Sequence, residues 1–466
     1  MPSYGSSINR SLYFALPYAV KNLTASIYGI QQRISRYGKE YRKSLEFLKK
    51  AQYWTNSRLL DYQKEQTARF IQQAFESTPY YRNRPSYGKD VALERLPLLE
   101  KNEVQCNLDQ FYPVHLHRIP YRWAHTSGTT GKSLVFPLSI SCFQREYAFR
   151  ALHYSWGNIS LSGREKVAFC AGHPVAHYDK NTPPFWVYDW TNNWLFLSSY
   201  HLSEKNLLHY IKELERFEPL MLGGYPSSIY LLALAYRKYG TGKLKLRSIY
   251  CSSETLLDFQ RRAIEDSFQT KVFNWYGTSE MCVNIVECEK GEMHLKLEHS
   301  YIEILNNHNK PCTPGETGRI ICTGFGNEAF PLVRYEIGDT VTISADQTSK
   351  CGRGGILIDK VLGRVEDYVI TADGRLAGRL DHIFKDSKNV VEAQIAQKKI
   401  GEVILRIVKN EVYSTADEQA ITQEAQLRLG SDTRLLFEYV DSIPRTKNGK
   451  FRFVESKINS TNMFNN

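Results

Sequence analysis

The sequence lacks several features that would point to whole classes of protein. It has no run of eighteen or more apolar residues, which argues against a membrane-spanning helix. It has no internal repeats and no low-complexity region, so neither a repeat protein nor a disordered chain is indicated. Its nine cysteines are odd in number and scattered over a long chain, which favours a reduced, cytoplasmic protein over a disulfide framework.

The features that are present are those of a globular protein with a basic balance. The chain has 466 residues, of which 42% are apolar and 23% charged, and this length predicts two or three domains. The formal net charge of +11 suggests an acidic ligand or an anionic surface. A basic cluster in residues 33–50 is most simply a solvated helix face, and peripheral contact with an anionic membrane or polysaccharide machinery is the alternative. We expect no nucleic-acid partner.

One polar stretch, residues 126–133, organises our interpretation of the rest of the sequence. Hydroxyls and glycines at this density build a turn whose N–H groups and hydroxyls can converge on phosphate oxygens, with a lysine as a point charge. The stretch ends like a Walker A motif, but the first glycine of that motif is missing because position 126 is Thr. A polar surface turn is the other alternative. The stretch runs Thr126, Ser127, Gly128, Thr129, Thr130, Gly131, Lys132, Ser133.

The periodicity predicts an α/β fold. Helical spacing covers residues 40–78, 141–157, 203–217, 227–239 and 256–268, and strands are expected at 166–170, 246–251 and 271–275. From about residue 282 short strands at 301–305, 318–323 and 340–343 indicate a β-rich subdomain. We therefore expect a helical region over 1–100 packed on a core domain of α/β layers over 101–365, followed by a small, mobile α+β lid domain over 366–466.

Later motifs follow the polar stretch in a fixed order. They are Ser252-Ser253-Glu254, Asn274-Trp275-Tyr276-Gly277-Thr278-Ser279-Glu280, Gly338-Asp339, Gly363-Arg364 and the loop 443–450 that ends at Lys450. Together with residues 126–132 this set resembles the adenylate-forming (acyl-CoA synthetase-like) superfamily. The match is best to its phenylacetate–CoA ligase branch, which includes CapK-like proteins of capsular polysaccharide biosynthesis.

The resemblance implies ATP- and Mg²⁺-dependent activation of a carboxylic acid as an acyl-adenylate, with release of pyrophosphate and then acyl transfer. Residues 126–132 would grip the β- and γ-phosphates, and Glu280 would hold Mg²⁺, which prefers oxygen ligands. Asp339 and Arg364 would reach the ribose, Glu366 would be the hinge, and Lys450 would bridge the carboxylate and the α-phosphate. The adenine would be lined by Ser252, Ser253, Glu254, Asn274, Trp275, Tyr276, Gly277 and Thr278, with an aromatic ring stacked on the base.

The resemblance thus makes Lys450, Glu280 and Thr126 the expected catalytic residues. Each has a plainer alternative. Glu280 could cap the next helix, Asp339 could be a simple turn residue, and the basic loop at Lys450 could be a solvated surface loop.

Two segments depart from the family pattern. Residues 371–379 lack a convincing copy of the glycine-bearing loop that admits CoA, so a sugar hydroxyl or an amine becomes an alternative acceptor to CoA. Cys288, His294 and Cys351 resemble a zinc site found in part of the branch, but Ser349 stands where a paired cysteine would complete it. Structural zinc needs four ligands. Cys282 could be the fourth, but the pattern favours ordinary buried thiols over zinc.

The acyl pocket is expected from residues 121–125, 171–177 and 223–227, where His173 and His177 could orient a carboxylate.

Three functions remain open. The first is a carboxylate-activating ligase acting on a small-molecule acid, with a phenylacetate–CoA ligase-like aryl acid–CoA ligase as its variant. The second is a non-catalytic nucleotide-binding partner protein, and the third is a P-loop kinase or ATPase.

Overall fold

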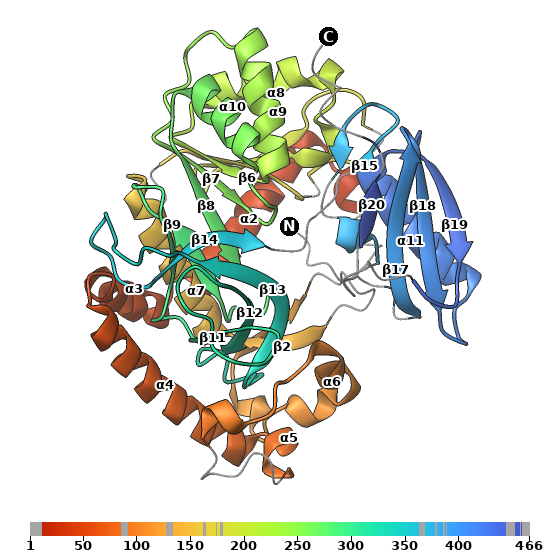
Figure 1. Cartoon of the computed structure of the whole chain (residues 1–466). Helices are drawn as coiled ribbons and strands as arrows, with labels where there is room; N and C mark the ends of the chain where they lie inside the picture. Colours follow the sequence, from red (N-terminus) through yellow and green to blue (C-terminus); the bar gives the residue numbers. More distant parts are fainter. Residues whose placement is uncertain are drawn as a thin grey trace.

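The computed structural model describes residues 12–84, 92–126, 134–161, 165–173, 175–177, 180–362, 369–377, 380–384, 387, 389–443, 453–456 and 458 (Figure 1). The predicted α/β class is confirmed, with a large sheet between helical layers and a separate C-terminal sheet. The helices are α2 Tyr18–Arg36, α3 Lys39–Ala51, α4 Asn56–Ser77, α5 Pro79–Arg82, α6 Lys101–Cys106, α7 Ile140–Trp156, α8 Glu204–Phe217, α9 Pro226–Tyr239, α10 Asp258–Phe268 and α11 Thr415–Leu429. Short 3-10 turns are η2 Leu93–Arg95, η3 Leu108–Phe111, η4 Leu116–Arg118, η5 Ser199–His201 and η6 Leu380–Phe384.

Twelve strands form one continuous sheet, in the order β11-β12-β13-β14-β10-β9-β8-β7-β6-β3-β5-β4. The strands β3, β5, β6, β7 and β8 are parallel, and the others in this sheet are antiparallel to their neighbours. Their bounds are β3 Val167–Ala171, β4 Trp186–Asp189, β5 Trp194–Ser198, β6 Met221–Gly224, β7 Ser248–Ser252, β8 Val272–Gly277, β9 Asn284–Glu287, β10 Met293–Leu295, β11 Tyr301–Leu305, β12 Thr317–Thr323, β13 Tyr335–Ile343 and β14 Ile356–Leu362.

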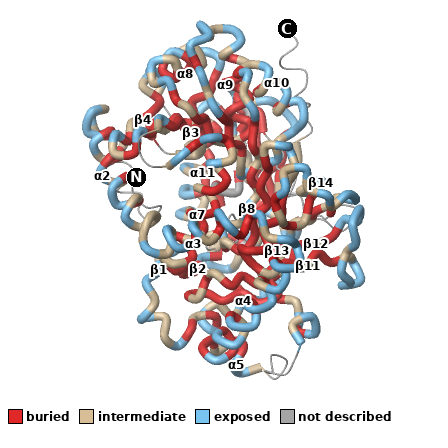
Figure 2. Tube along the Cα trace, turned by 90° about the vertical axis from the view of Figure 1, so that its left-hand side faces the viewer, coloured by how far each residue is buried: buried red, intermediate tan, exposed pale blue. Residues whose placement is uncertain are grey.

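Alternate residues of the parallel strands face two helical layers. In β7, Ile249 and Cys251 pack with α8, α9 and α10, whereas Tyr250 points to the opposite face and packs with Tyr154 of α7. This is the two-sided burial expected of parallel strands. Figure 2 shows the buried residues concentrated along these strands between the helices.

The other sheets are smaller. Strands β1 Tyr121–His125 and β2 Val135–Ser139 form an antiparallel hairpin. The C-terminal part has a two-stranded sheet, β15 Val369–Ile370 with β16 Leu376–Ala377, and a four-stranded sheet. The latter has the order β19-β18-β17-β20, with β17 Val390–Lys399, β18 Glu402–Lys409, β19 Arg434–Tyr439 and β20 Val454–Ser456, and it shares a core with α11.

The helical periodicity over 40–78 is divided between two helices. The chain leaves the helix after Ala51, and the Thr55 hydroxyl accepts a hydrogen bond from the Arg58 N–H to cap α4. A threonine at this position satisfies an N–H group that a new helix leaves unpaired. All nine cysteines lie in described segments and none is in a disulfide. Among the described helices, none combines the length and the apolar character required to cross a bilayer.

A buried ion pair holds the start of β13, the strand that carries Asp339. Arg334 donates to both carboxylate oxygens of Glu303, at 2.6 and 2.8 Å, and also to the backbone oxygen of Glu94 at 2.8 Å. Both side chains of the ion pair are buried. Removing one member of such a pair leaves a buried charge without its partner, which is costly.

We expect Arg334→Met to lower the free energy of unfolding by about 3–5 kcal/mol because Glu303 would remain buried and uncompensated. The control is Arg319→Met, since Arg319 pairs with Glu336 at 2.7 Å in a half-buried position. Its expected cost is below about 1 kcal/mol. Urea unfolding followed by tryptophan fluorescence measures both. Equal losses in the two variants would contradict the importance of the buried pair.

Candidate active site

The carboxyl ends of the parallel strands bring the predicted motifs to one edge of the sheet. Strands β3, β6, β7 and β8 run in the same direction and end at Ala171, Gly224, Ser252 and Gly277. Loops after such strand ends form the usual ligand site of an open α/β sheet. The motifs at these four strand ends, residues 171, 224, 252 and 277, therefore face a common region.

Thr126 stands at the base of the predicted phosphate loop. Its N–H donates to the Leu134 carbonyl at 2.9 Å, and its hydroxyl accepts from the Leu134 N–H at 3.0 Å. These bonds extend the β1–β2 hairpin, so the loop joins two antiparallel strands. A P-loop instead joins a strand to a helix, which disfavours the kinase or ATPase hypothesis. Ser127, Gly128, Thr129, Thr130, Gly131 and Lys132 lie outside the described residues.

Two side-chain hydrogen bonds fasten the end of β8 and the turn after it to strand β13. The Tyr276 hydroxyl donates to Asp339 Oδ2 at 2.7 Å, and the Tyr335 hydroxyl donates to Glu280 Oε1 at 3.2 Å. Burial, reinforced by the neighbouring Asp339 carboxylate, holds the pKa of Tyr276 well above its usual value, so this phenol remains a donor. The structure thus brings together Glu280 and Asp339, two carboxylates predicted for different parts of one nucleotide.

The motif after β7 lies beside the start of α9. Ser253 has a positive φ of 72°, uncommon for a residue with a side chain, and Glu254 Oε2 accepts from the Ser227 N–H at 3.1 Å. A carboxylate at a helix N-terminus is stabilised by the orphan N–H groups there. Contact of Ser252, Ser253 and Glu254 with adenine stays a prediction, as it does for Asn274, Gly277 and Thr278.

Aromatic stacking on adenine stays a prediction, and the sequence did not assign it to one residue of Asn274-Trp275-Tyr276. The Trp275 ring is buried, its Nε1 donates to Asn284 Oδ1 at 3.0 Å, and the Arg150 guanidinium lies 4.7 Å from the ring centroid on one side. Alternation along a strand turns neighbouring side chains to opposite faces. Tyr276, half-buried and bonded to Asp339, is therefore the aromatic residue of this strand that faces the candidate site.

The predicted acyl pocket contains packed histidines. The His173 ring contacts Phe196 with 4.8 Å between centroids, and burial lowers the pKa of His173 to about 4. It is therefore a neutral imidazole near pH 7 and supplies no positive charge to a carboxylate. The His177 ring lies edge-on to the Phe14 ring. The backbone carbonyl of His177 accepts a hydrogen bond from His201 Nε2 at 2.9 Å.

A cation that we did not predict links the C-terminal part of the chain to η5, directly after β5. Arg375, at the β15–β16 turn, is buried and donates to the Tyr200 carbonyl, while the Tyr200 hydroxyl donates to the Gly172 carbonyl at 3.3 Å. Arg375 also pairs with Asp373 at 2.8 Å. The only sequence signal was its place in the segment 371–379 that departs from the family. Arg364, Glu366 and Lys450 lie outside the described residues.

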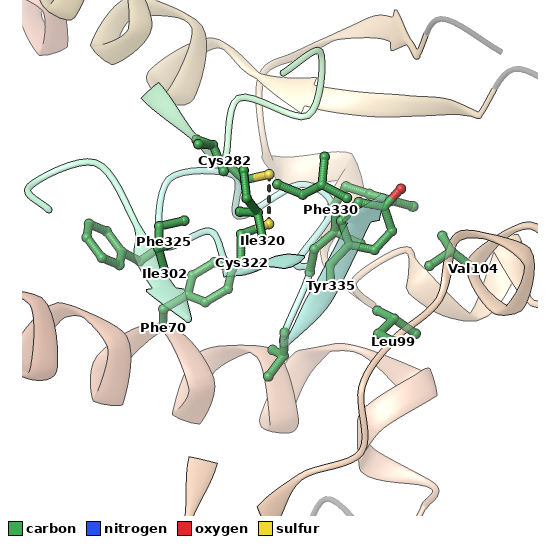
Figure 3. Close-up of a cluster of buried hydrophobic side chains, with 14 of the residues drawn as sticks. Phe70, Leu99, Val104, Cys282, Ile302, Ile320, Cys322, Phe325, Phe330 and Tyr335 are labelled. Atoms are coloured by element: carbon green, nitrogen blue, oxygen red, sulfur yellow. Dashed lines mark hydrogen bonds between the residues drawn. The ribbon is translucent and has the colours of Figure 1, made fainter. Parts of the chain in front are cut away.

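The possible zinc ligands gain a fourth member, and it is not Cys282. Cys282 Sγ points to Cys322 Sγ at 2.8 Å in the apolar core beneath β13 (Figure 3). Instead, ligand atoms of Cys288, Glu292, His294 and Cys351 all lie within 4.8 Å of one another. Glu292 Oε2 is 3.9 Å from His294 Nε2, which lies 3.3 Å from Cys351 Sγ.

This donor set fits zinc. Two thiols, one imidazole and one carboxylate are all zinc ligands, and four ligands close a structural site. Burial lowers the pKa of His294 to about 4, so its ring is neutral, as a metal ligand requires. Zinc here would link the β9–β10 turn to the loop before β14. The carboxylate of Glu292 would take the place of the cysteine that is absent at Ser349.

Comparisons with known proteins agree with the family resemblance of the sequence. A family model described as the CapK C-terminal domain matches residues 369–457. The chain is 27% identical to protein CapK of Staphylococcus aureus, over 96% of this chain and 99% of that protein. It is 24% identical to a phenylacetate-coenzyme A ligase of Thermus thermophilus, over 66% of this chain and 71% of that protein.

Solved structures agree on the fold. A 2-hydroxyisobutyryl-CoA ligase in complex with 2-HIB-AMP and CoA has a TM-score of 0.55 and 18% identity, over 86% of this chain and 90% of that one. The same ligase in its postadenylation state has a TM-score of 0.50. The expected resemblance to adenylate-forming ligases of the phenylacetate–CoA ligase and CapK branch is confirmed.

We expect the purified protein to carry close to one zinc ion per chain because four suitable ligands converge. Cys351→Ser should lower the zinc content measured by elemental analysis, and it should lower the thermal midpoint. Cys312→Ser, a matched loss of a half-buried thiol elsewhere, should change neither. Wild-type protein without zinc that keeps its midpoint after treatment with a chelator would contradict the zinc site.

Proposed function

We propose that this relative of CapK and of phenylacetate–CoA ligases activates a carboxylic acid with ATP, forming an acyl-adenylate and pyrophosphate. The observation that carries the proposal is the pair of hydrogen bonds that joins Tyr276 to Asp339 and Tyr335 to Glu280. It supports one nucleotide site built from the end of β8, the turn after it and strand β13.

The chemistry needs two anions, a carboxylate and a triphosphate, to approach each other. Charge complementarity at the developing pentacovalent phosphorus is therefore the main requirement. Asp339 would accept hydrogen bonds from the ribose hydroxyls, and Tyr276 would hold that carboxylate in place. Glu280 would hold Mg²⁺, because a carboxylate oxygen is its preferred protein ligand. When bound, Mg²⁺ would supply positive charge against the phosphates.

The remaining roles rest on the family resemblance. The hydroxyls and N–H groups of residues 126–132 would bind the β- and γ-phosphates, and Lys450 would reach the carboxylate and the α-phosphate. Arg364 would contact the ribose beside a hinge at Glu366. In this proposal residues 1–100 are a helical region packed on the core 101–365, and the lid from 366 rotates between an adenylation and a transfer orientation.

We further propose that the acyl group passes to a hydroxyl or an amine of a polysaccharide precursor. The similarity to CapK extends over nearly the whole chain and includes the C-terminal domain, whereas the phenylacetate–CoA ligase match covers two thirds of the chain. In addition, residues 371–375 form a tight turn whose Arg375 is fixed on the Tyr200 carbonyl.

CoA is the alternative acceptor, because several relatives are named as CoA ligases and one solved neighbour contains CoA. A non-catalytic nucleotide-binding role is less well supported, because Glu280, Asp339 and Lys450 are all present.

Wild-type protein should catalyse carboxylate-dependent exchange of labelled pyrophosphate into ATP when screened over a panel of acids. Glu280→Gln and Lys450→Ala should each lower the exchange rate about 100-fold or more, on the scale of losing one electrostatic contact in a transition state. The exposed residues Glu100 and Lys399 provide matched controls, Glu100→Gln and Lys399→Ala, which should keep wild-type rates. A wild-type protein that binds no MgATP in calorimetry would refute the enzymatic function.

The acceptor is tested with the acid that performs best in that screen. Release of AMP should rise when amino-sugar nucleotides or sugar acceptors are added, and should change little when CoA is added. Product identity is followed by mass spectrometry. Efficient formation of an acyl-CoA by the purified protein would show that CoA is the acceptor, while leaving the adenylation proposal intact.

A further inference from the structure

Helix α2 is packed with its polar side inward. The residues it buries are Lys21, Asn22, Ala25, Ser26, Gly29 and Gln32. Its exposed side carries Val20, Leu23, Ile27, Ile30 and Ile34, which are 39% to 74% exposed. The spacing of 3, 4, 3 and 4 residues places these five side chains in one row along the helix. No charged residue of α2 is classed as exposed. We call this row the α2 stripe.

The packing of α2 against the sheet explains why its polar side faces inward and its aliphatic side outward. Strand β4 is at the edge of the twelve-stranded sheet, where one side of the strand has no neighbouring strand. The Tyr188 N–H donates to Asn22 Oδ1 and the Trp190 N–H donates to Ser26 Oγ, both at 3.0 Å. Short polar side chains of α2 thus satisfy N–H groups along the edge, as edge strands require.

Gly29 allows α2 to approach the end of β4 closely. A Cβ atom at this position would lie 2.2 Å from an Asp189 carboxylate oxygen at the end of β4. Because the polar and small residues are used against the sheet edge, the aliphatic residues necessarily face away from it. A row of five aliphatic side chains on the surface is typical of an interaction site rather than of scattered exposure.

The next helix, α3, carries basic side chains on its exposed face. The exposed residues of α3 include Lys39, Arg42, Lys43, Glu46, Lys49 and Lys50, five of them basic, at spacings that place them on one helix face. Both helices pack against α7, and the Gln144 side chain of α7 binds the connection between them through Ser35 and Glu40. In Figure 2, α2 lies at the left-hand side of the molecule, and α3 lies below it and nearer the middle.

We propose that the α2 stripe and the basic face of α3 form a docking surface for a membrane that contains anionic lipids. An interfacial helix lies in the membrane plane with an aliphatic face toward the acyl chains, and nearby lysines and arginines bind anionic headgroups. Trp190, 56% exposed and adjoining α2 through Ser26, is the residue type enriched at this depth. A second copy fits less well as the occupant, because each chain carries a net charge of +11 and copies repel.

The proposal is independent of the catalytic function and is tested by co-sedimentation of the full chain with vesicles. Wild type should bind vesicles with about one third phosphatidylserine at least about tenfold more strongly than pure phosphatidylcholine vesicles, and salt should weaken the binding. The double variant Ile27→Gln/Ile30→Gln and the double variant Lys43→Glu/Lys50→Glu should each lose about tenfold or more.

Matched controls use exposed residues elsewhere, Val412→Gln for the stripe and Lys243→Glu/Lys245→Glu for the charges, and should bind as wild type does. Circular dichroism and the thermal midpoint confirm that each variant is folded, and light scattering after size exclusion gives its mass. Absent or lipid-independent binding of wild type overturns the proposal, as does undiminished binding of both double variants. If wild type does not bind vesicles but self-associates, and Ile27→Gln/Ile30→Gln abolishes the self-association, the occupant of the stripe is a second copy of the chain.

Discussion

The candidate site depends on the hydrogen bonds between two tyrosines and two carboxylates. Tyr276 lies at the end of β8, the last parallel strand, and Glu280 lies in the turn that follows it, whereas Tyr335 and Asp339 belong to an antiparallel strand of the same sheet. Each tyrosine donates to the carboxylate of the other segment. A buried or half-buried carboxylate needs such donors because its desolvation is costly. The result is that two negative groups are held at defined positions before any ligand arrives.

This arrangement is possible because the sheet is continuous. The β-rich region after residue 282 is hydrogen-bonded to the parallel strands through β9, so the two regions share one rigid layer. Cys282, in the segment between β8 and β9, contacts Cys322 of β12 in the shared apolar core, and the Arg334–Glu303 pair holds the start of β13 against β11. Close packing between these segments therefore helps to fix the position of β13 relative to the end of β8.

Two features outside the candidate active site arise where a group lacks its usual partner. The edge strand β4 has N–H groups without a neighbouring strand, and α2 satisfies them with asparagine and serine, which leaves its aliphatic side facing outward. Near the middle of the sheet, beside β9, β10 and β14, Glu292 supplies the fourth candidate zinc ligand where Ser349 stands in place of a paired cysteine. At β4 the need to satisfy backbone N–H groups determines which side of α2 faces the sheet, and its aliphatic side is left exposed.

Local physical chemistry was enough to predict the element types and the order of the motifs. Periods of 3.6 and 2 residues and helix-stopping prolines depend only on neighbours in the chain, so strands such as Tyr301–Leu305 and helices such as α7 and α8 were predicted to within a few residues. The break between α3 and α4 was missed because the apolar spacing continues through it, although Thr55 is a capping residue. The tertiary structure alone decided that Tyr276 meets Asp339, 63 residues away, and that Glu292 joins Cys288, His294 and Cys351. It also decided that Trp275 is buried and that α2 turns its polar face inward. These features depend on strand register and on the surface that each element meets, and neither is encoded in any short stretch of sequence.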